Sequence, residues 1–274
     1  PHQGAGYFEV ADKKNQKFYT EKYGVTHPTK AGLKIPQMFD AAINKELKGI
    51  WIIGEDIVQT DPNSAHVVDA MNSLELLVVQ EIFMSETAKL ATVVLPGTTF
   101  LEKDGTFTNT ERRVQRVNRA VPPLPGTKPD GVIVTDMMQK LGFDQPTYDA
   151  DQVLAEIADI VPFFKGITRE RLGKMGLQWP VKEDGTDTQI LHTEEFKLGK
   201  GRLKNFDWKE SSEIEANHKE YPLILTTSRV LQHYNAATMT RRTNNINIVD
   251  EDVLLIHPKD AANRDLNTGD IGRL

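Results

Sequence analysis

Residues 76–113 read LLVVQEIFMSETAKLATVVLPGTTFLEKDGTFTNTERR, and this stretch decides the fold. Two apolar runs of strand length lie in it, at residues 76–79 and 92–95. Between them, residues 85–90 are typical of a short helix with Ser85 as its N-cap. A polar, glycine-containing segment follows the second run. Strand, helix, strand and polar loop in this order predict half of a nucleotide-binding α/β unit, with the ligand bound where the parallel strands end.

A further strand is expected upstream, at residues 50–53. Its sequence, IWII, is apolar throughout, as is usual for parallel strands that are covered on both faces. A predicted helix at residues 63–71 separates it from the strand at 76–79, and this spacing suits a right-handed crossover. The two strands are therefore expected to be adjacent and parallel, with Glu55 and Glu81 near each other at their carboxyl ends.

Outside this unit, hydrophobic spacing and turn residues predict further elements. Residues 1–38 are read as turn-rich, and residues 166–207 as an irregular connection over the surface. The other predicted helices are those at residues 40–49 with Asp40 as cap and Gly49 as end, 132–141, 151–160 and 259–264. Strands are expected at residues 223–227 and 253–256.

The fold class predicted from these patterns is α/β, with a parallel Rossmann-like sheet flanked by helices. The chain is divided into an α/β domain at residues 1–160, a connecting segment at 161–218 and a smaller second domain at 219–274. A few short strands cannot close a barrel or a sandwich. The second domain is therefore expected to be cut partway through.

Composition limits the classes of function. The 274 residues carry 33 basic and 39 acidic side chains, a net charge of −6, which argues against nonspecific nucleic-acid binding. There is no cysteine, so this chain supplies no disulfide and no thiolate ligand for a metal or an iron–sulfur cluster. No apolar run is long enough for a transmembrane helix. The chain opens at Pro1 with no initiator methionine or signal peptide, so we expect a piece excised from a longer protein.

Polar residues after the predicted strands are candidates for a nucleotide site. The carboxylates of Glu81 and Asp130 can each accept two parallel N–H bonds from a guanine edge, and Gln80 precedes the first of them. Lys103 suits a phosphate, and Gly54 lets a ligand approach the backbone. Each residue alone is more simply read as a surface charge or a turn. Together at one sheet edge, they favour nucleotide binding.

A second polar segment, residues 227–235, follows the strand predicted at 223–227. It offers hydroxyl groups, a guanidinium, an imidazole and an amide within nine residues. The alternative is an ordinary ordered loop.

Several blocks of the sequence resemble the molybdenum or tungsten bis-(molybdopterin guanine dinucleotide) oxidoreductases. This family contains formate dehydrogenases, periplasmic and assimilatory nitrate reductases and dimethyl sulfoxide reductase. The blocks are QEIF at residues 80–83, EKDGTFTNTERR at 102–113, GED at 54–56 and SRVLQHY at 228–234. GED at 54–56 is similar to the formate dehydrogenase version of its loop. The resemblance covers most of residues 50–142 and 221–274.

The resemblance implies that two groups of residues contact the cofactor. The positions that match guanosine- and phosphate-holding positions of the family are Gly54, Glu55, Asp56, Gln80, Glu81, Lys103 and Asp130, with Asn109 as a further cofactor-binding position. The positions that match the loop near the pterin are Thr227, Ser228, Arg229, Val230, Leu231, His233, Tyr234 and Asn235. The resemblance also implies that the second domain is the first part of a six-stranded β-barrel.

The function implied by the resemblance is that of part of a formate dehydrogenase catalytic subunit. The parent would oxidise formate to carbon dioxide, a two-electron reaction, at a molybdenum or tungsten centre held by bis-molybdopterin guanine dinucleotide. The metal ligand, a Cys or selenocysteine with a His beside it, and the iron–sulfur segment are missing here. This piece is therefore expected to cradle the dinucleotides and to be inactive by itself.

Other functions stay open from the sequence. A nitrate reductase fragment is the alternative within the family. A free-standing cofactor-binding module and an assembly subunit that has lost ligand binding are alternatives from other classes. For the parent we expect formate, an electron acceptor and electron-transfer subunits as partners, with no nucleic acid and no membrane span. A cytoplasmic location is expected, or a periplasmic one if the parent carries an export signal.

Overall fold

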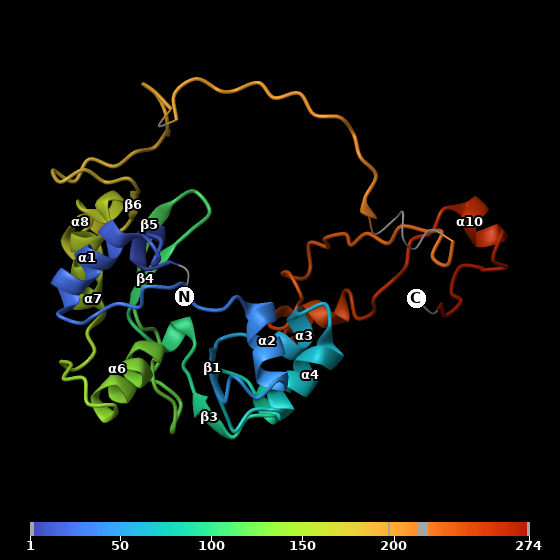
Figure 1. The fold of residues 1–274 in the computed structure, drawn as a ribbon, viewed down its shortest axis with the longest axis horizontal. Coiled ribbons are helices and arrows are strands. Elements are labelled where there is room, and N and C mark those ends of the chain that lie inside the picture. Colours follow the sequence, from blue (N-terminus) through green and yellow to red (C-terminus); the bar gives the residue numbers. More distant parts are fainter. Residues whose placement is uncertain (1–2, 197, 213–218, 273–274) are drawn as a thin grey trace. The chain divides into compact units, whose positions relative to one another are not determined.

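The computed structural model describes residues 3–196, 198–212 and 219–272. The chain forms two compact units, Pro1–Asn205 and Phe206–Leu274, which are described one at a time (Figure 1). None of the helices among the described residues combines the length and the apolar character that crossing a bilayer requires.

The first unit contains a three-stranded parallel sheet in the order β1, β2, β3. The strands are β1 (Gly49–Ile53), β2 (Leu76–Glu81) and β3 (Val93–Pro96). Ile53 pairs with Gln80, and Glu81 pairs with Pro96. The Gly54 N–H donates to the Gln80 carbonyl oxygen at 2.8 Å, so the first two strands end side by side. The predicted adjacent and parallel arrangement of these two strands is confirmed.

Helices connect the strands of this sheet. They are α3 (Ile57–Thr60), α4 (Ser64–Asn72) and α5 (Glu86–Lys89). The Asn63 side chain accepts a hydrogen bond from the His66 N–H at 3.3 Å and starts α4. The Ser85 hydroxyl accepts a hydrogen bond from the Ala88 N–H at 3.2 Å and starts α5. The predicted N-cap at Ser85 is therefore confirmed.

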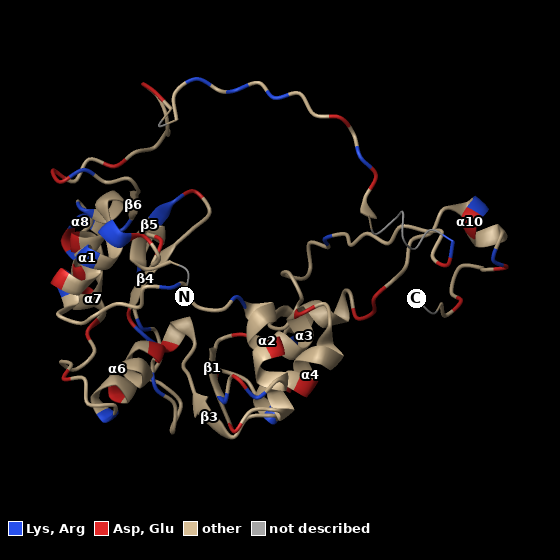
Figure 2. Ribbon diagram, in the orientation of Figure 1, with Lys and Arg blue, Asp and Glu red and all other residues tan. Residues whose placement is uncertain are grey.

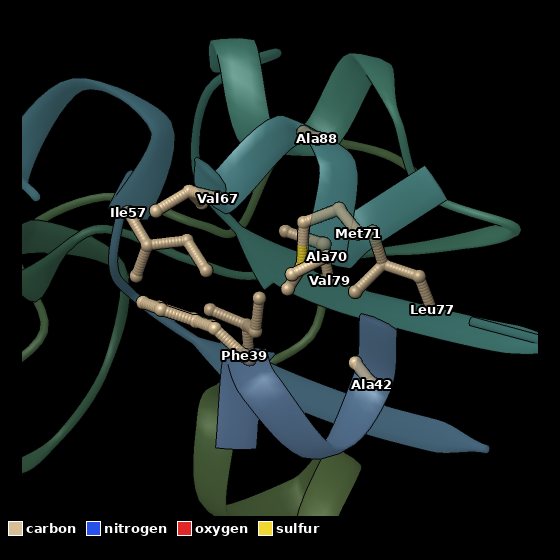
Figure 3. Close-up of a cluster of buried hydrophobic side chains, with 10 residues drawn as sticks. Phe39, Ala42, Ile57, Val67, Ala70, Met71, Leu77, Val79 and Ala88 are labelled. Atoms are coloured by element: carbon tan, nitrogen blue, oxygen red, sulfur yellow. The ribbon is translucent and has the colours of Figure 1, made fainter. Parts of the chain in front are cut away.

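An apolar core lies between the parallel sheet and the helices that pack on it (Figure 3). Its buried side chains come from α2, from the first two strands and from the connecting helices. They are Phe39, Ala42, Ile52, Ile57, Val67, Ala70, Met71, Leu77, Val79 and Ala88. Burial of this cluster is the main favourable contribution to the fold of the parallel sheet.

Helix α2 (Ile35–Ile43) begins earlier than the sequence predicted. Asp40 lies inside it, so the prediction that Asp40 caps a helix ending at Gly49 is wrong. Pro36 stands in the first turn, where a missing N–H costs nothing. The helix stops before Lys45, which adopts a left-handed φ of 62°.

A second, antiparallel sheet forms where the sequence showed only a polar loop. Its strands, in order, are β4 (Gly105–Thr108), β5 (Arg113–Val117) and β6 (Leu177–Gln178). The side-chain oxygen of Asn109 accepts hydrogen bonds from the N–H groups of Glu111 and Arg113, both at 3.0 Å, and closes the hairpin. Only Val114 of β5 is buried among the residues of β4 and β5, so these strands carry no apolar run that would reveal them.

The first unit also contains α1 (Lys13–Tyr23), α6 (Asp130–Lys140), α7 (Ala150–Ile160) and α8 (Arg169–Leu172). Helices α6 and α7 confirm two predicted helices, whereas α1 lies in a segment that was read as turn-rich. The Asp12 carboxylate accepts hydrogen bonds from the Lys14 and Asn15 N–H groups, at 2.8 and 3.0 Å, and starts α1. Gly24, with φ 67°, ends it. Helices α1, α6 and α8 carry both acidic and basic residues, whereas the charged residues of α7 are all acidic (Figure 2).

Part of the segment expected to be an irregular connection packs onto the antiparallel sheet. Ile167, Leu172 and Val181 are buried together with Val114 and Leu154. The segment from residue 166 to 188 is thus more structured than its many turn residues indicated. The domain boundaries assigned from the sequence stay predictions.

The second unit contains η4 (Thr240–Arg242), η5 (Asn244–Asn247) and α10 (Pro258–Ala262). Helix α10 confirms the short helix predicted at residues 259–264. No strand forms among the described residues of this unit, so the strands predicted at residues 223–227 and 253–256 are wrong for this structure. A strand needs a neighbour for its N–H and C=O groups, and short apolar runs without one stay unpaired. The β-barrel stays a prediction.

Candidate functional site

Three polar side chains from distant parts of the sequence meet at the carboxyl end of the parallel sheet. Gln80, near the end of β2, is fully buried, and its Nε2 donates to Asp130 Oδ1 at 2.8 Å. The Lys103 ammonium forms an ion pair with Asp130 Oδ2 and donates to the Thr98 carbonyl oxygen at 3.2 Å. Residues that the sequence placed in one site are therefore in one cluster.

The end of β3 brings Asp130 to this cluster. Gly97, which follows β3, forms a parallel β-bridge with Lys128. Helix α6 begins at Asp130, two residues after Lys128. A Cβ on Gly97 would lie 3.0 Å from Asp130 Oδ1. Glycine at this position therefore leaves room for the carboxylate.

Lys103 is positioned by a capping box around η2 (Phe100–Glu102). Glu102 Oε2 accepts hydrogen bonds from the Thr99 N–H and hydroxyl, both at 2.8 Å. Glu102 Oε1 accepts from the Leu124 N–H at 2.8 Å. These bonds, above all that from the Thr99 N–H, hold the pKa of Glu102 below its ordinary value. The Thr-x-x-Glu spacing signals this box, and the sequence analysis did not use it.

The Asp130 carboxylate is ionised at neutral pH. Burial raises its pKa, but the hydrogen bonds from Lys103 and Gln80 and the charge of Lys103 outweigh the effect of burial, so the pKa lies below its ordinary value. An ionised carboxylate can only accept hydrogen bonds. In this structure those bonds come from Gln80 and Lys103.

Two buried polar atoms near the cluster lack partners. Gln80 Oε1 and Thr98 Oγ1 have no hydrogen-bond partner among the described residues. Thr98 is only 1% exposed, and its carbonyl oxygen accepts from Lys103. An unpaired buried polar atom costs about 1–3 kcal/mol. The polar network is thus incomplete at the strand end where a ligand is expected.

A pocket of about 200 Å³ opens beside the cluster. Lys103, Asp130 and Tyr148 contribute polar groups to its wall. The larger apolar side chains in the wall are Phe100, Phe107, Val117, Val153, Leu154 and Ile157. Pockets for drug-sized ligands measure roughly 300–1,000 Å³, so this one suits a single ring system.

The loop after β1 holds the three other residues predicted to contact guanosine from that side. Asp56 is buried, and its Oδ1 accepts hydrogen bonds from the Thr87 hydroxyl at 2.6 Å and the Thr87 N–H at 2.9 Å. Asp56 therefore ties its loop to α5. Glu55 is exposed, and Gly54 adopts φ 63°, a conformation that glycine favours.

Glu81 and Asn109 engage in local bonds. Glu81 Oε1 accepts a hydrogen bond from the N–H of the next residue, Ile82, at 2.7 Å. Glu81, like Gln80, lies outside the described lining of the pocket, and its part in guanosine binding stays a prediction. Asn109 closes the hairpin, and its part in cofactor binding stays a prediction.

The loop predicted to lie near the pterin belongs to the second unit. Arg229 Nη1 donates to Asn235 Oδ1 at 2.9 Å and spans the loop. His233 Nε2 donates to the Val249 carbonyl oxygen at 2.7 Å, which leaves Nδ1 to accept from the Thr240 hydroxyl at 3.1 Å. The exposed members of the loop are Thr227, Ser228, Arg229, Val230, Leu231, Tyr234 and Asn235. His233 therefore orders a loop whose other predicted contact residues face solvent.

The described residues contain no group of three or more His, Asp or Glu side chains arranged to hold a metal ion. The chain also has no cysteine.

Two family models match the chain. The model described as molybdopterin oxidoreductase matches residues 8–140, and the model described as molybdopterin dinucleotide binding domain matches residues 223–273. The chain belongs to the molybdopterin oxidoreductase family. The first match contains the Gln80, Lys103 and Asp130 cluster. The resemblance seen in the sequence is confirmed, and the matched domains support a molybdopterin dinucleotide as the family's cofactor.

Relatives of this family member include proteins named as formate dehydrogenases. The F420-dependent formate dehydrogenase subunit alpha of Methanocaldococcus jannaschii is 40% identical over 275 residues, which covers 99% of this chain and 40% of that protein. The F420-dependent formate dehydrogenase 2 subunit alpha of Methanococcus maripaludis is 42% identical over 245 residues, which covers 87% of this chain and 36% of that protein. The chain therefore spans less than half the length of these relatives.

A solved structure has a similar fold. Acetylene hydratase from Pelobacter acetylenicus matches with a TM-score of 0.57 and 20% identity, over 93% of this chain and 38% of that one. At this identity the likeness concerns the fold alone. Together with the parallel sheet and its helices, it supports the mixed α/β class predicted from the sequence.

Proposed function

We propose that this chain is part of the catalytic subunit of a formate dehydrogenase, and that its first unit holds the guanosine end of a molybdopterin guanine dinucleotide. The ion pair of Lys103 and Asp130 in the wall of the pocket, with Gln80 bound to the same carboxylate, carries the guanosine part of the proposal. The names of the two archaeal relatives support formate as the substrate of the longer protein.

The cluster fits the donors of guanine. The N1–H and 2-amino groups of guanine stand side by side, and a carboxylate such as that of Asp130 accepts both. Gln80 is fully buried and holds the other carboxylate oxygen of Asp130 through its Nε2. In the bound state Lys103 turns its ammonium from Asp130 to a phosphate, and the released carboxylate oxygen accepts from the base.

The bound cofactor supplies the molybdenum or tungsten centre at which the longer protein oxidises formate to carbon dioxide. The residues of this chain bind and orient the nucleotide end. The loop around Arg229 and His233 is the proposed contact for the pterin part. The iron–sulfur cluster, the electron acceptor and the electron-transfer subunits belong to the longer protein in this proposal. The 274-residue chain alone is expected to oxidise no formate.

Asp130→Ala in the longer protein tests this assignment. The substitution removes a charge-assisted contact that contributes about 1.5–3 kcal/mol, so cofactor content and formate-dependent reduction of a dye should fall together. Cofactor content is measured by pterin fluorescence and by guanine released on hydrolysis.

The matched control for that experiment is Asp136→Ala. Asp136 lies on the same helix and forms a 2.6 Å ion pair with Lys128, outside the described lining of the pocket. This variant should keep its cofactor. Full cofactor content in Asp130→Ala, or equal losses in both variants, would show that Asp130 does not hold the nucleotide.

A further inference from the structure

Tyr148 lines the same pocket as Lys103 and Asp130, and no motif in the sequence singles it out. It lies in the segment between α6 and α7, next to Asp149, whose side chain caps α7. Asp149 Oδ1 accepts hydrogen bonds from the Asp151 and Gln152 N–H groups, at 2.8 and 3.0 Å. The backbone on one side of Tyr148 is therefore fixed.

The Tyr148 ring is fixed as well, because it lies directly on the backbone of Gly131. A Cβ on Gly131 would stand 2.1 Å from Tyr148 Cε2. Gly131 is the second residue of α6, immediately after Asp130. Glycine at position 131 therefore leaves space for the Tyr148 ring next to Asp130. A side chain at this position would fill that space.

The charges around the phenol agree with this position. Burial raises the pKa of Tyr148 first, and the negative charges of Asp130 and Asp149 raise it further. The phenol is neutral at neutral pH. Tyr148 and Asp130 both line the pocket.

We propose that Tyr148 is the stacking wall of the nucleotide site: the edge of the guanine base meets Asp130, while its face lies on the Tyr148 ring. The inference rests on the proposed guanosine site. A pocket of about 200 Å³ holds one ring system, and Asp130 is one of the residues that line it. Aromatic side chains favour stacked contacts with planar rings, and base stacking does not depend on hydrogen-bond readout. Tyr148 therefore contributes affinity for the base, and Asp130 selects guanine.

The experiment uses the 274-residue chain and guanosine monophosphate as the probe. A base stacked on an aromatic ring has its H8 proton in the ring current, so H8 should shift upfield on binding. In Tyr148→Leu that shift should vanish and the affinity should fall about 5- to 150-fold, the range of a lost stacking contact. Tyr148→Phe keeps the ring and should restore the shift. Gly131→Ala leaves Tyr148 in the sequence but displaces its ring, and should remove the shift as Tyr148→Leu does.

Phe143→Leu is the matched control, since Phe143 lies in the same segment, is 53% exposed and is outside the described pocket lining. It should bind as the wild-type chain does. An unshifted H8 with binding that depends on Asp130 would overturn the Tyr148 assignment alone. The Tyr148 assignment would also be overturned if the H8 shift were lost in Phe107→Leu and kept in Tyr148→Leu. Failure of the wild-type chain to bind the probe would overturn both this inference and the guanosine site.

Discussion

Asp56 and Asp130 are two carboxylates near the ends of the parallel strands, and their partners give them different roles. Asp56 accepts from the N–H and hydroxyl of Thr87, which are held in place by the fold. Asp130 accepts from the ends of two long side chains, Gln80 and Lys103. Because the long Lys103 side chain is partly exposed, Asp130 can exchange this partner for a ligand, whereas Asp56 shapes its loop.

The sequence could name these residues but could not separate their roles. Thr87 is 31 residues from Asp56, and Gln80 is 50 residues from Asp130. Such partners are known only once the fold has brought them together. Tyr148 had no signal at all, because its place depends on contact with Gly131 across a turn.

Glu102 gives a pH-dependent prediction at the scale of one residue. Hydrogen bonds from Thr99 and Leu124 hold its pKa below the ordinary value of 4.5. A lowered pKa means that the carboxylate stabilises the fold above the ordinary value, and that this stabilisation is lost as pH falls through the lower folded-state pKa. Glu102→Gln should therefore reduce the free energy of unfolding at about pH 7 and have a smaller effect below about pH 4.

Urea unfolding of wild type and Glu102→Gln at the two pH values measures this difference. A gap between the two proteins that stays constant, or widens in acid, would contradict the capping-box account. A Thr99→Ser variant keeps both donors and should behave like the wild type.

At the scale of elements, two adjacent residues of the central strand β2 lie on opposite faces of the sheet and differ in exposure. Leu77 is 1% exposed in the apolar core, whereas its neighbour Leu76 is 46% exposed. Leu77→Ala should lower the free energy of unfolding by about 2–5 kcal/mol, because it removes buried methyl groups and leaves a cavity. Leu76→Ala, the same chemical change on the same strand, should cost much less. Denaturant unfolding of both variants measures the difference, and equal costs would show that the register of β2 is wrong.

Elements with an apolar run were predictable, whereas elements whose residues are mostly exposed were missed even where a cap marks their start. The strands β1 and β2 and the cap at Ser85 follow from apolar runs and a hydroxyl before a helix. The hairpin of β4 and β5 was missed because both strands are largely exposed and polar. Helix α1 was missed because it buries only Tyr19. Apolar patterns in the local sequence predict buried elements well and give little signal for exposed ones.

At the scale of the whole chain, the two units differ in how much they bury. The first unit has three apolar clusters. In the second, Ala237 is the one buried apolar residue among those described, and Ile224 and Leu255 are 75% and 88% exposed. The match to the dinucleotide binding domain therefore rests on sequence in this unit. Resemblance predicted the order of the domains, whereas the paired strands that it implied for the second unit do not form here.

The central claim is that the Asp130 carboxylate recognises the edge of guanine. Calorimetry with guanosine and inosine monophosphate tests it, since inosine lacks only the 2-amino group. The wild-type chain should bind the guanosine nucleotide about 10-fold or more tightly than the inosine nucleotide, because a hydrogen bond to a charged group contributes about 1.5–3 kcal/mol. In Asp130→Ala this preference should fall to nearly none. A preference that persists unchanged in Asp130→Ala, or that is absent from the wild-type chain, would contradict the account.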